Sequence, residues 1–416
     1  MTSIAGFPGE KPTSRPNAWV LTLIVFAAIL VRAVFLAPMA VSGNLDDPDN
    51  YLPLAHSLIQ GQGFAINGRP TAYRPPLYPI VLAPVVAVSG GRVAWGVGAL
   101  HLTLGVATVL MTAVAARRLG LTPNRVLFAA AVVALDPVLV SQSKSVMTET
   151  LAACLSVCAI AALTLPGRSG PIVGGVIFGL GALCRPTALA VVVLSALFAC
   201  WSRDTPLRIR LSRAGWLLGF TALTLAPWAL RNLQAVGAPI FTTTHGGYTL
   251  ALANNPVYYD EVVNGPAGAV WTGRNQWLWW DSVNRRTESL PESAADRILR
   301  DEALRVIRER PGDFARATLA RLGRFWGIAP AAAVYPLRLR IATALWTVPL
   351  WLALVSGLCR REVWGWPHVA APATLLALTL VHGAYWTDMR MRAAAVPAIA
   401  LTAACASTSH RRRISG

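Results

Sequence analysis

Three aspartates, Asp46, Asp47 and Asp49, follow directly on the first long apolar run of this chain, where a membrane span would end. Charged groups are costly in lipid and gather at its edge only where they serve a water-filled or functional site. Carboxylates at this depth can act as general bases or hold a divalent cation. We therefore expect the chemistry of the protein in the loop between residues 44 and 79.

The composition predicts a polytopic membrane protein. Of the 416 residues, 55% are apolar and 13% charged, and the mean hydropathy is +0.51, values that do not fit a soluble protein of this length. The net charge is +18, but the basic residues form short clusters between apolar runs, so we expect no binding to nucleic acid. All six cysteines lie within or at the ends of apolar runs, which indicates neither a disulfide framework nor a metal cluster.

The apolar runs predict an all-α protein with about ten transmembrane helices. Two of these runs, 171–184 and 187–201, are short and separated by Arg185-Pro186, and we interpret them as a tight helical pair, with a single kinked helix as the alternative. The other eight predicted spans are 18–40, 93–116, 126–141, 149–165, 214–230, 341–358, 367–386 and 393–406.

The positive-inside rule assigns the sides of the membrane, because alternate loops of the predicted spans hold the short basic clusters. These clusters, which we place in the cytoplasm, are Lys11 with Arg15, Arg117 with Arg118 and Arg125, Arg168, the stretch 203–213, Arg360 with Arg361, and Arg411 to Arg413. Both termini are then cytoplasmic. The opposite side receives a first loop (41–92), in which we expect amphipathic helices, and a long segment (231–340).

The long segment divides the chain into a first membrane module (1–230), the segment itself, and the last membrane helices with a cytoplasmic tail (341–416). The segment is polar, and residues 291–310 predict a surface helix. It also carries four tryptophans, which suit an anchor at the membrane interface or, alternatively, a platform for a sugar ring. They are Trp271, Trp277, Trp279 and Trp280.

The motifs and their order resemble the GT-C superfamily of integral-membrane glycosyltransferases, in particular the family 39-like group that includes protein mannosyltransferases and lipid A aminoarabinose transferases. The resemblance covers most of the chain. The matching elements are Asp47-Pro-Asp-Asn-Tyr51, Tyr73-Arg74-Pro75-Pro76-Leu-Tyr78-Pro79, Thr148-Glu149, Arg185-Pro186-Thr187, Pro227-Trp228 with Arg231-Asn232, the stretch Gly246 to Pro256, and Arg390-x-Arg392 with Pro397.

The resemblance implies an inverting enzyme that passes a sugar from a polyprenyl-phosphate donor to a lipid, glycan or protein acceptor on the extracytoplasmic face. It implies Asp47, four residues before Tyr51, as the base that deprotonates the acceptor, with Asp46 and Asp49 beside it. The alternative is that these carboxylates only cap the following helix. No cofactor is required, and Asp47 and Asp49 could hold a divalent metal as a DxD pair.

Glu149 is the second catalytic candidate, as an orienting or tuning carboxylate, although a glutamate at a helix N-terminus is also favoured by the macrodipole. A departing phosphate gains negative charge, so arginines should surround it. We expect this role for Arg390, Arg74, Arg231, Arg185 and Arg392, some of which could instead be snorkelling anchors. Candidate sugar or acceptor contacts are Tyr51, Tyr73, Tyr78, His245, Tyr248, Asn254 and Asn255.

Two other functions fit parts of the pattern. A flippase for a lipid-linked sugar would use the same arginines, but the chain has no evident internal repeat, and Asp136, its nearest mid-span carboxylate, precedes Pro137 as at a helix end. A non-catalytic scaffold could have kept the fold. Lys144, one of only two lysines in the chain, lies on the same side as the first loop, where we interpret it as a surface residue. We expect a multi-pass protein of a bacterial inner membrane.

Overall fold

The structure, a computed structural model, describes residues 16–201, 205–266, 269, 271 and 274–406. The basic residues Lys11, Arg15, Arg203 and Arg411 to Arg413, on which part of the predicted sidedness depends, lie outside the described residues. The described chain is mostly helical, which confirms an all-α protein.

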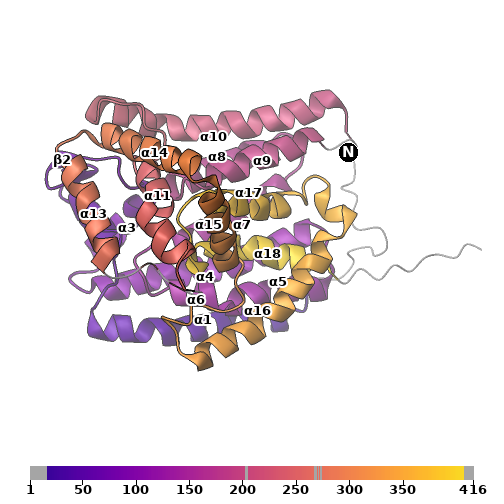
Figure 1. The fold of residues 1–416 in the computed structure, drawn as a ribbon. Coiled ribbons are helices and arrows are strands. Elements are labelled where there is room, and N and C mark those ends of the chain that lie inside the picture. The colour runs from indigo at the N-terminus through magenta and orange to yellow at the C-terminus, as the bar shows by residue number, and fades with distance from the viewer. Residues whose placement is uncertain (1–15, 202–204, 267–268, 270, 272–273, 407–416) are drawn as a thin grey trace, which may run out of the picture.

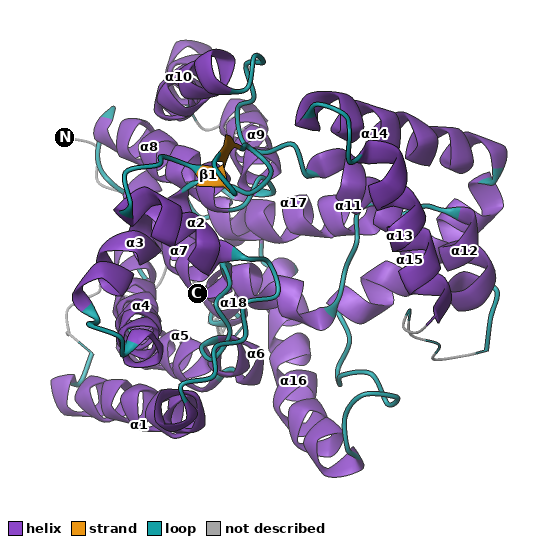
Figure 2. Ribbon diagram, turned by 90° about the vertical axis from the view of Figure 1, so that its left-hand side faces the viewer, coloured by secondary structure: helices purple, strands orange, loops and turns teal. Residues whose placement is uncertain are grey.

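Most of the predicted spans form a helical bundle (Figures 1 and 2). Helix α7 packs against α4 and α8, and α8 packs against α10. The bundle helices are α1 (Ala18–Ser42), α4 (Val93–Arg118), α5 (Pro123–Leu135), α6 (Pro137–Gln142), α7 (Glu149–Leu163), α8 (Ser169–Cys184), α9 (Ala188–Trp201), α10 (Leu207–Ala235), α16 (Leu337–Leu358), α17 (Ala370–Ala384) and α18 (Val396–Ala403).

Four described helical segments are long and apolar enough to cross a membrane: α1, α4, α5 continued by α6, and α16. Helices α7, α8, α9 and α17 are apolar but shorter. Most residues of α7 are buried, because a helix that is apolar all round must be covered by its neighbours. The protein is therefore a helical membrane protein, and the count of about ten spans remains a prediction.

The structure interrupts the predicted span 126–141. Helix α5 ends at Leu135, and Asp136 leaves the helical path to cap α6, its Oδ1 accepting from the backbone N–H groups of Val138 and Leu139 at 3.0 Å each. The physical reason is Pro137, which cannot donate a hydrogen bond to the preceding turn and is suited to the first position of a new helix. Asp136 is buried, and its carboxylate serves this helix break.

The runs 171–184 and 187–201 form two helices, α8 and α9, as expected of the helical pair. Arg185 between them is extended, with φ −144° and ψ 118°, because the residue before a proline is driven away from the helical region. The last span is also shorter than predicted: residues 389–395 form a 3₁₀ helix, and α18 follows it.

The first loop holds two helices, α2 (Tyr51–Ile59) and α3 (Leu77–Val88), joined by a hairpin of β1 (Ala65–Ile66) and β2 (Arg69–Pro70). The antiparallel strands pair Ala65 with Pro70. Their two-residue turn, Asn67-Gly68, has positive φ angles of 51° and 74°, as the Asn-Gly turns of hairpins require.

The long segment folds as further helices that gather toward one end of α1 and α10 (Figure 1). They are α11 (Gly246–Ala253), α12 (Pro256–Tyr258) with a π turn at Tyr259–Val263, α13 (Arg274–Thr287), α14 (Glu292–Glu309) and α15 (Pro311–Phe325). Helix α14 confirms the predicted surface helix at 291–310. A short 3₁₀ turn, Arg361–Trp364, lies between α16 and α17.

The four tryptophans of the long segment differ in exposure and do not form one surface. Trp271 is 4% exposed and packs against Tyr258 at 5.4 Å and Trp279 at 5.3 Å between ring centroids. Trp277 and Trp280 are 56% and 44% exposed on α13. Only these two face outward, where an interfacial anchor would have to be.

Close packing explains why α8 is rich in glycine. A Cβ added at Gly175 would lie 2.6 Å from the carbonyl oxygen of Leu217 on α10, and the hydroxyl of Thr221 donates to the Gly175 carbonyl at 3.0 Å. Small residues let membrane helices approach this closely.

We therefore expect Gly175→Val to force α8 and α10 apart and to destabilise the purified protein by about 1–3 kcal/mol, the usual cost of overpacking. Thermal unfolding in detergent measures it. The matched control is Gly215→Val on α10, where an added Cβ meets nothing within 4 Å. Equal melting temperatures for the two variants would contradict the packing argument.

Candidate active site

Asp47 caps the first helix of the first loop. Its Oδ1 accepts from the backbone N–H of Tyr51 at 2.9 Å and its Oδ2 from that of Leu52 at 2.8 Å. Burial raises the pKa of Asp47, against the opposing effect of these two hydrogen bonds. Asp47 therefore does cap α2, and its burial makes this carboxylate a stronger base than an exposed aspartate.

The other two aspartates have different partners. The Asp46 carboxylate accepts from the Ser145 hydroxyl at 2.9 Å, and its backbone carbonyl accepts from the Val146 N–H at 2.7 Å. Asp49 forms an ion pair with Arg74, Oδ1 to Nη2 at 3.0 Å. The three carboxylates thus connect the first loop to α2, to the turn before α7, and to the Arg74 side chain.

Arg74 is the centre of an aromatic and ionic group that we call the Arg74 cluster: Asp49, Tyr73, Arg74, His245 and Tyr248. The guanidinium lies 5.3 Å from the ring centroid of Tyr73 and 3.3 Å from Nε2 of His245. The His245 ring meets Tyr73 edge-on at 4.5 Å and stacks on Tyr248 at 5.0 Å. This brings together five predicted site residues from the first loop and the long segment.

His245 is neutral in this cluster. Burial, and secondarily the neighbouring charge of Arg74, lower the pKa of His245 to about 3. Its Nε2 can then accept the hydrogen bond from Arg74, which requires the proton to be on Nδ1. At physiological pH the neutral His245 imidazole can accept or donate a hydrogen bond, but it carries no positive charge with which to bind the phosphate of a donor.

A second ionic group surrounds the start of α7. Glu149 is fully buried and pairs with Arg185 at 2.8 Å. Arg185 also donates to the Thr148 hydroxyl at 3.2 Å. Asp388, which sequence reasoning did not identify, interacts electrostatically with Glu149 and forms an ion pair with Arg390 at 3.1 Å.

Two tyrosines lie between the two ionic groups. The rings of Tyr51 and Tyr78 meet edge-on at 5.1 Å. Tyr51 interacts electrostatically with both Arg74 and Arg185, and Tyr78 interacts with Asp47 and Glu149. Burial raises the pKa of both hydroxyls, so they stay neutral. Tyr51 is 3% and Tyr78 0% exposed, so both rings are packed inside the protein between the two ionic groups.

His101 is a buried member of the site that sequence reasoning missed. Its Nδ1 lies 2.7 Å from the Ser143 carbonyl, which can only accept, so Nε2 accepts from the Tyr78 hydroxyl at 2.8 Å. The only signal in the sequence is a lone histidine within an apolar run, which does not by itself distinguish a core residue from a functional one.

Arg231 and Arg392, two arginines predicted to contact the phosphate, donate to backbone carbonyls instead. Arg231 donates to the carbonyls of Phe64 at 2.6 Å and Thr71 at 2.7 Å and so supports the hairpin of the first loop. Arg392 is 2% exposed and donates to the Gly327 carbonyl at 2.9 Å. Both guanidiniums lie outside the two ionic groups.

The predicted sugar contacts Asn254 and Asn255 also point inward. The amide nitrogen of Asn254 donates to the Ala384 carbonyl at 2.8 Å, and its Oδ1 accepts from the Tyr259 hydroxyl at 2.9 Å. Asn255 caps α12 through the Tyr258 N–H at 2.9 Å. These asparagines stabilise the fold of the long segment.

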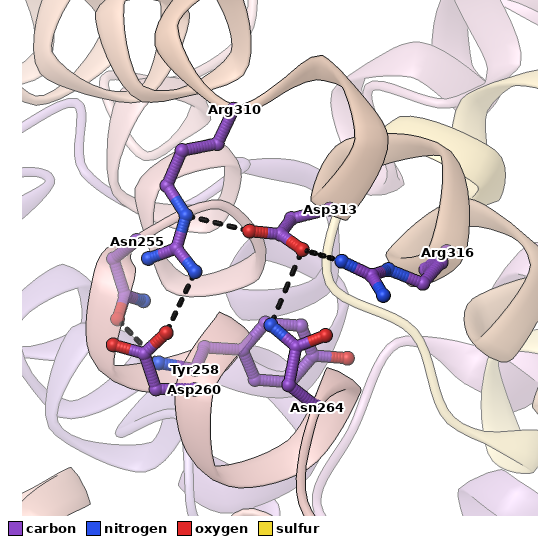
Figure 3. A network of polar contacts seen from close by, with 7 residues as sticks. All are labelled: Asn255, Tyr258, Asp260, Asn264, Arg310, Asp313 and Arg316. Carbon is purple, nitrogen blue, oxygen red and sulfur yellow. Dashed lines mark hydrogen bonds and ion pairs between the residues drawn. The ribbon is translucent and has the colours of Figure 1, made fainter.

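An ionic network stabilises the same region (Figure 3). Arg310 lies between the carboxylates of Asp260 and Asp313, at 2.6 Å from each. Asn264 donates to Asp313 at 3.2 Å, and Arg316 pairs with the same carboxylate. The network joins the π turn to α15 and has no member in either ionic group of the site.

No group of three or more histidine, cysteine, aspartate or glutamate side chains suited to a metal occurs within the described residues. Both oxygens of Asp47 accept backbone hydrogen bonds, and Asp49 pairs with Arg74. A divalent cation between these two carboxylates would have to replace those partners.

Comparison with solved structures gives the fold. The oligosaccharyltransferase of Archaeoglobus fulgidus, crystallised with a tethered acceptor peptide, matches with a TM-score of 0.54 and 15% identity over 94% of this chain and 49% of that one. The same enzyme, AglB, in complex with an inhibitory peptide and a dolichol-phosphate, matches with a TM-score of 0.51 and 14% identity over 92% of this chain and 50% of that one. This chain thus spans about half the length of these structures.

ArnT from Cupriavidus metallidurans, bound to undecaprenyl phosphate, is similar at a TM-score of 0.45 and 16% identity over 93% of this chain and 77% of that one. No protein-family model matches the chain, and no curated protein sequence does. The chain therefore shares the fold of the oligosaccharyltransferase structures over most of its length. Membership of the GT-C superfamily, and of the family 39-like group within it, stays a prediction.

Glu292, the first residue of α14, is a further residue that sequence reasoning missed. Its carboxylate accepts from the Thr71 hydroxyl at 2.5 Å, the Ala72 N–H at 2.9 Å and the Thr244 hydroxyl at 3.1 Å. Arg74 follows two residues after Ala72. Glu292 thus connects the long segment to the stretch after β2 that carries Arg74.

We expect Glu292→Gln to loosen this connection, because an amide has one accepting oxygen where the carboxylate has two and loses the charge that strengthens all three bonds. Hydrogen exchange of the 64–76 backbone should speed up by about tenfold or more, since each such bond contributes about 1.5–3 kcal/mol. The control is Glu288→Gln, an exposed residue of the same segment. Unchanged exchange in Glu292→Gln would contradict the connection.

Proposed function

We propose that this protein is an inverting glycosyltransferase that moves a sugar from a polyprenyl-phosphate donor to a lipid, glycan or protein acceptor on the extracytoplasmic face of a bacterial inner membrane. The observation that carries the proposal is that Tyr51 and Tyr78 interact electrostatically with both ionic groups, the one at Asp47, Asp49 and Arg74 and the one at Glu149 and Arg185. The fold that the chain shares with the oligosaccharyltransferase structures, one of which contains a dolichol-phosphate, supports the proposal.

Asp47 supplies the base in this mechanism. It takes the proton of the acceptor hydroxyl while that oxygen attacks the anomeric carbon of the sugar from the side opposite the phosphate. The bond from the anomeric carbon to the phosphate oxygen breaks, and the phosphate keeps the electron pair. The raised pKa of Asp47 strengthens it as a base, and the attack from the opposite side inverts the anomeric centre.

Arg74, Arg185 and Arg390 are the arginines that we assign to the departing phosphate. Their side chains are 14%, 15% and 33% exposed, so each can reach a ligand while its carboxylate partner holds it in place. Guanidinium groups suit this role, because they contact phosphate oxygens in pairs. Arg231 and Arg392, which hold backbone carbonyls, are no longer assigned to the phosphate.

A narrow cavity of about 40 Å³, room for about one water molecule, adjoins Arg185. Its lining is largely apolar and comes from α7, α8, α9 and α17, with Phe178 and Leu378 among its residues. A volume of this size is too small for a prenyl chain, so the cavity does not place the lipid part of the donor. Under the proposal, the partners of the protein are the lipid-linked sugar, its acceptor and the surrounding lipids.

Asp47→Asn tests the proposal directly. We expect sugar release from a panel of radiolabelled polyprenyl-phosphate hexoses and pentoses, in nanodiscs, to fall by about 10²–10⁴-fold, as on loss of a general base. Donor binding should persist, because the arginines remain. The control is Asp301→Asn, an exposed aspartate on α14. Full turnover in Asp47→Asn would instead favour transport or a scaffold.

The pH dependence gives a second test. Since only the deprotonated carboxylate accepts a proton, kcat/KM should fall as the pH drops through the raised pKa of Asp47, above the usual aspartate value of about 4. His245, with a pKa of about 3, stays neutral over that range. We therefore expect His245→Gln to leave the position of the acid limb unchanged. A limb that moves with His245→Gln would assign the titration to the histidine.

A further inference from the structure

A groove of about 560 Å³ opens on the side of α1, and the mechanism above does not use it. This volume lies within the range of small-molecule sites in proteins, about 300–1,000 Å³. One part of the lining is apolar and comes from α1, and the other is polar and comes from the first loop and the turn before α7. The lining residues are Val34, Phe35, Pro38, Met39, Asn44, Asp46 and Lys144.

The apolar part of the groove faces the lipid. Helix α1 is the most apolar of the four candidate spans and the least covered by protein, with a mean hydropathy of 2.7. Val34 and Phe35 are 62% and 45% exposed near its end. Since this helix is long and apolar enough to cross the membrane, an acyl chain can lie along these side chains without leaving the bilayer.

The polar end of the groove holds a cation without a partner. Lys144 is exposed, and no hydrogen bond or ion pair joins its side chain to any residue of the described ranges. Most of the described arginines of the site, by contrast, pair with a carboxylate or a carbonyl. An ammonium at the end of an apolar groove is a place for a negatively charged head group.

Asp46 limits which anion fits. Its Oδ2 accepts from the Ser145 hydroxyl at 2.9 Å, which leaves Oδ1 free to accept from a ligand. A head group with several negative charges would be repelled by this carboxylate. One with a single phosphate diester and free hydroxyls satisfies both side chains, because the phosphate meets Lys144 while a hydroxyl donates to Asp46 or to the Asn44 side chain.

We propose that this groove binds an anionic phospholipid with a hydroxyl-bearing head group, whose acyl chain lies on Val34 and Phe35 and whose phosphate pairs with Lys144. The site is separate from the Arg74 cluster, and its occupancy does not depend on the proposed sugar transfer. It gives Lys144 a role that an ordinary surface lysine would lack.

The full-length protein in phosphatidylcholine vesicles, with nitroxide-labelled phosphatidylglycerol or phosphatidylcholine as the probe, tests the proposal. The motionally restricted fraction in the electron spin resonance spectrum reports binding. We expect wild type to prefer labelled phosphatidylglycerol, and Lys144→Gln to lower this preference by about fivefold, the effect of one lysine near a lipid surface. Arg69→Gln, which removes an exposed charge of the same loop, is the matched control and should keep the preference.

Two further arms separate a lipid from a free anion. Val34→Trp fills the groove at an exposed position and should also lower the restricted fraction, whereas inorganic phosphate should compete only weakly. The proposal is overturned if Lys144→Gln keeps the wild-type preference, or if Arg69→Gln loses as much. It is equally overturned if inorganic phosphate displaces the probe while Val34→Trp has no effect, since the groove would then hold a free anion.

Discussion

The structure depends on which hydrogen-bond and ion-pair partners the arginine side chains find in and around an apolar helical bundle. A guanidinium near hydrocarbon must be hydrogen-bonded, because leaving it without a partner is costly. Arg32, Arg321 and Arg392 are buried and donate to backbone carbonyls where helices break or end. Arg74 and Arg185 are partly exposed and pair with carboxylates. The choice of partner separates arginines that hold the fold from those that can meet a ligand.

The site exists only because two parts of the chain are held together. The first loop supplies Asp47 and Arg74, and Glu292 of the long segment holds the stretch after β2 that carries Arg74. Helix α11 packs closely on α14, since a Cβ at Gly247 would lie 1.9 Å from the Asp296 carbonyl oxygen. The long segment thus presents His245 and Tyr248 to Arg74, and movement of this segment would open the cluster.

Two ionic groups around a pair of buried tyrosines suit a reaction in which an acceptor hydroxyl loses its proton and a sugar loses its phosphate. The proposed base and the proposed phosphate contact lie beside different helices, so each can be tuned separately: Asp47 by burial and by the start of α2, Arg185 by Glu149. The groove beside α1 lies on the other side of Asp46, which turns toward Ser145, while Asp47 turns toward α2. Neighbouring residues therefore serve two different surfaces.

The sequence by itself determined the class of protein and most of its helices, because apolar runs, proline and helix caps are local signals. It located the helix at 291–310 and singled out Asp47, Glu149 and Arg74, whose roles stay predictions. Only the tertiary structure decided the partners: Asp46 meets a serine 99 residues away, and Arg74 a histidine 171 residues away. It turned Asn254 and Arg392 inward and revealed Glu292, since a polar side chain in isolation does not specify whether a carbonyl, a carboxylate or a ligand will satisfy it.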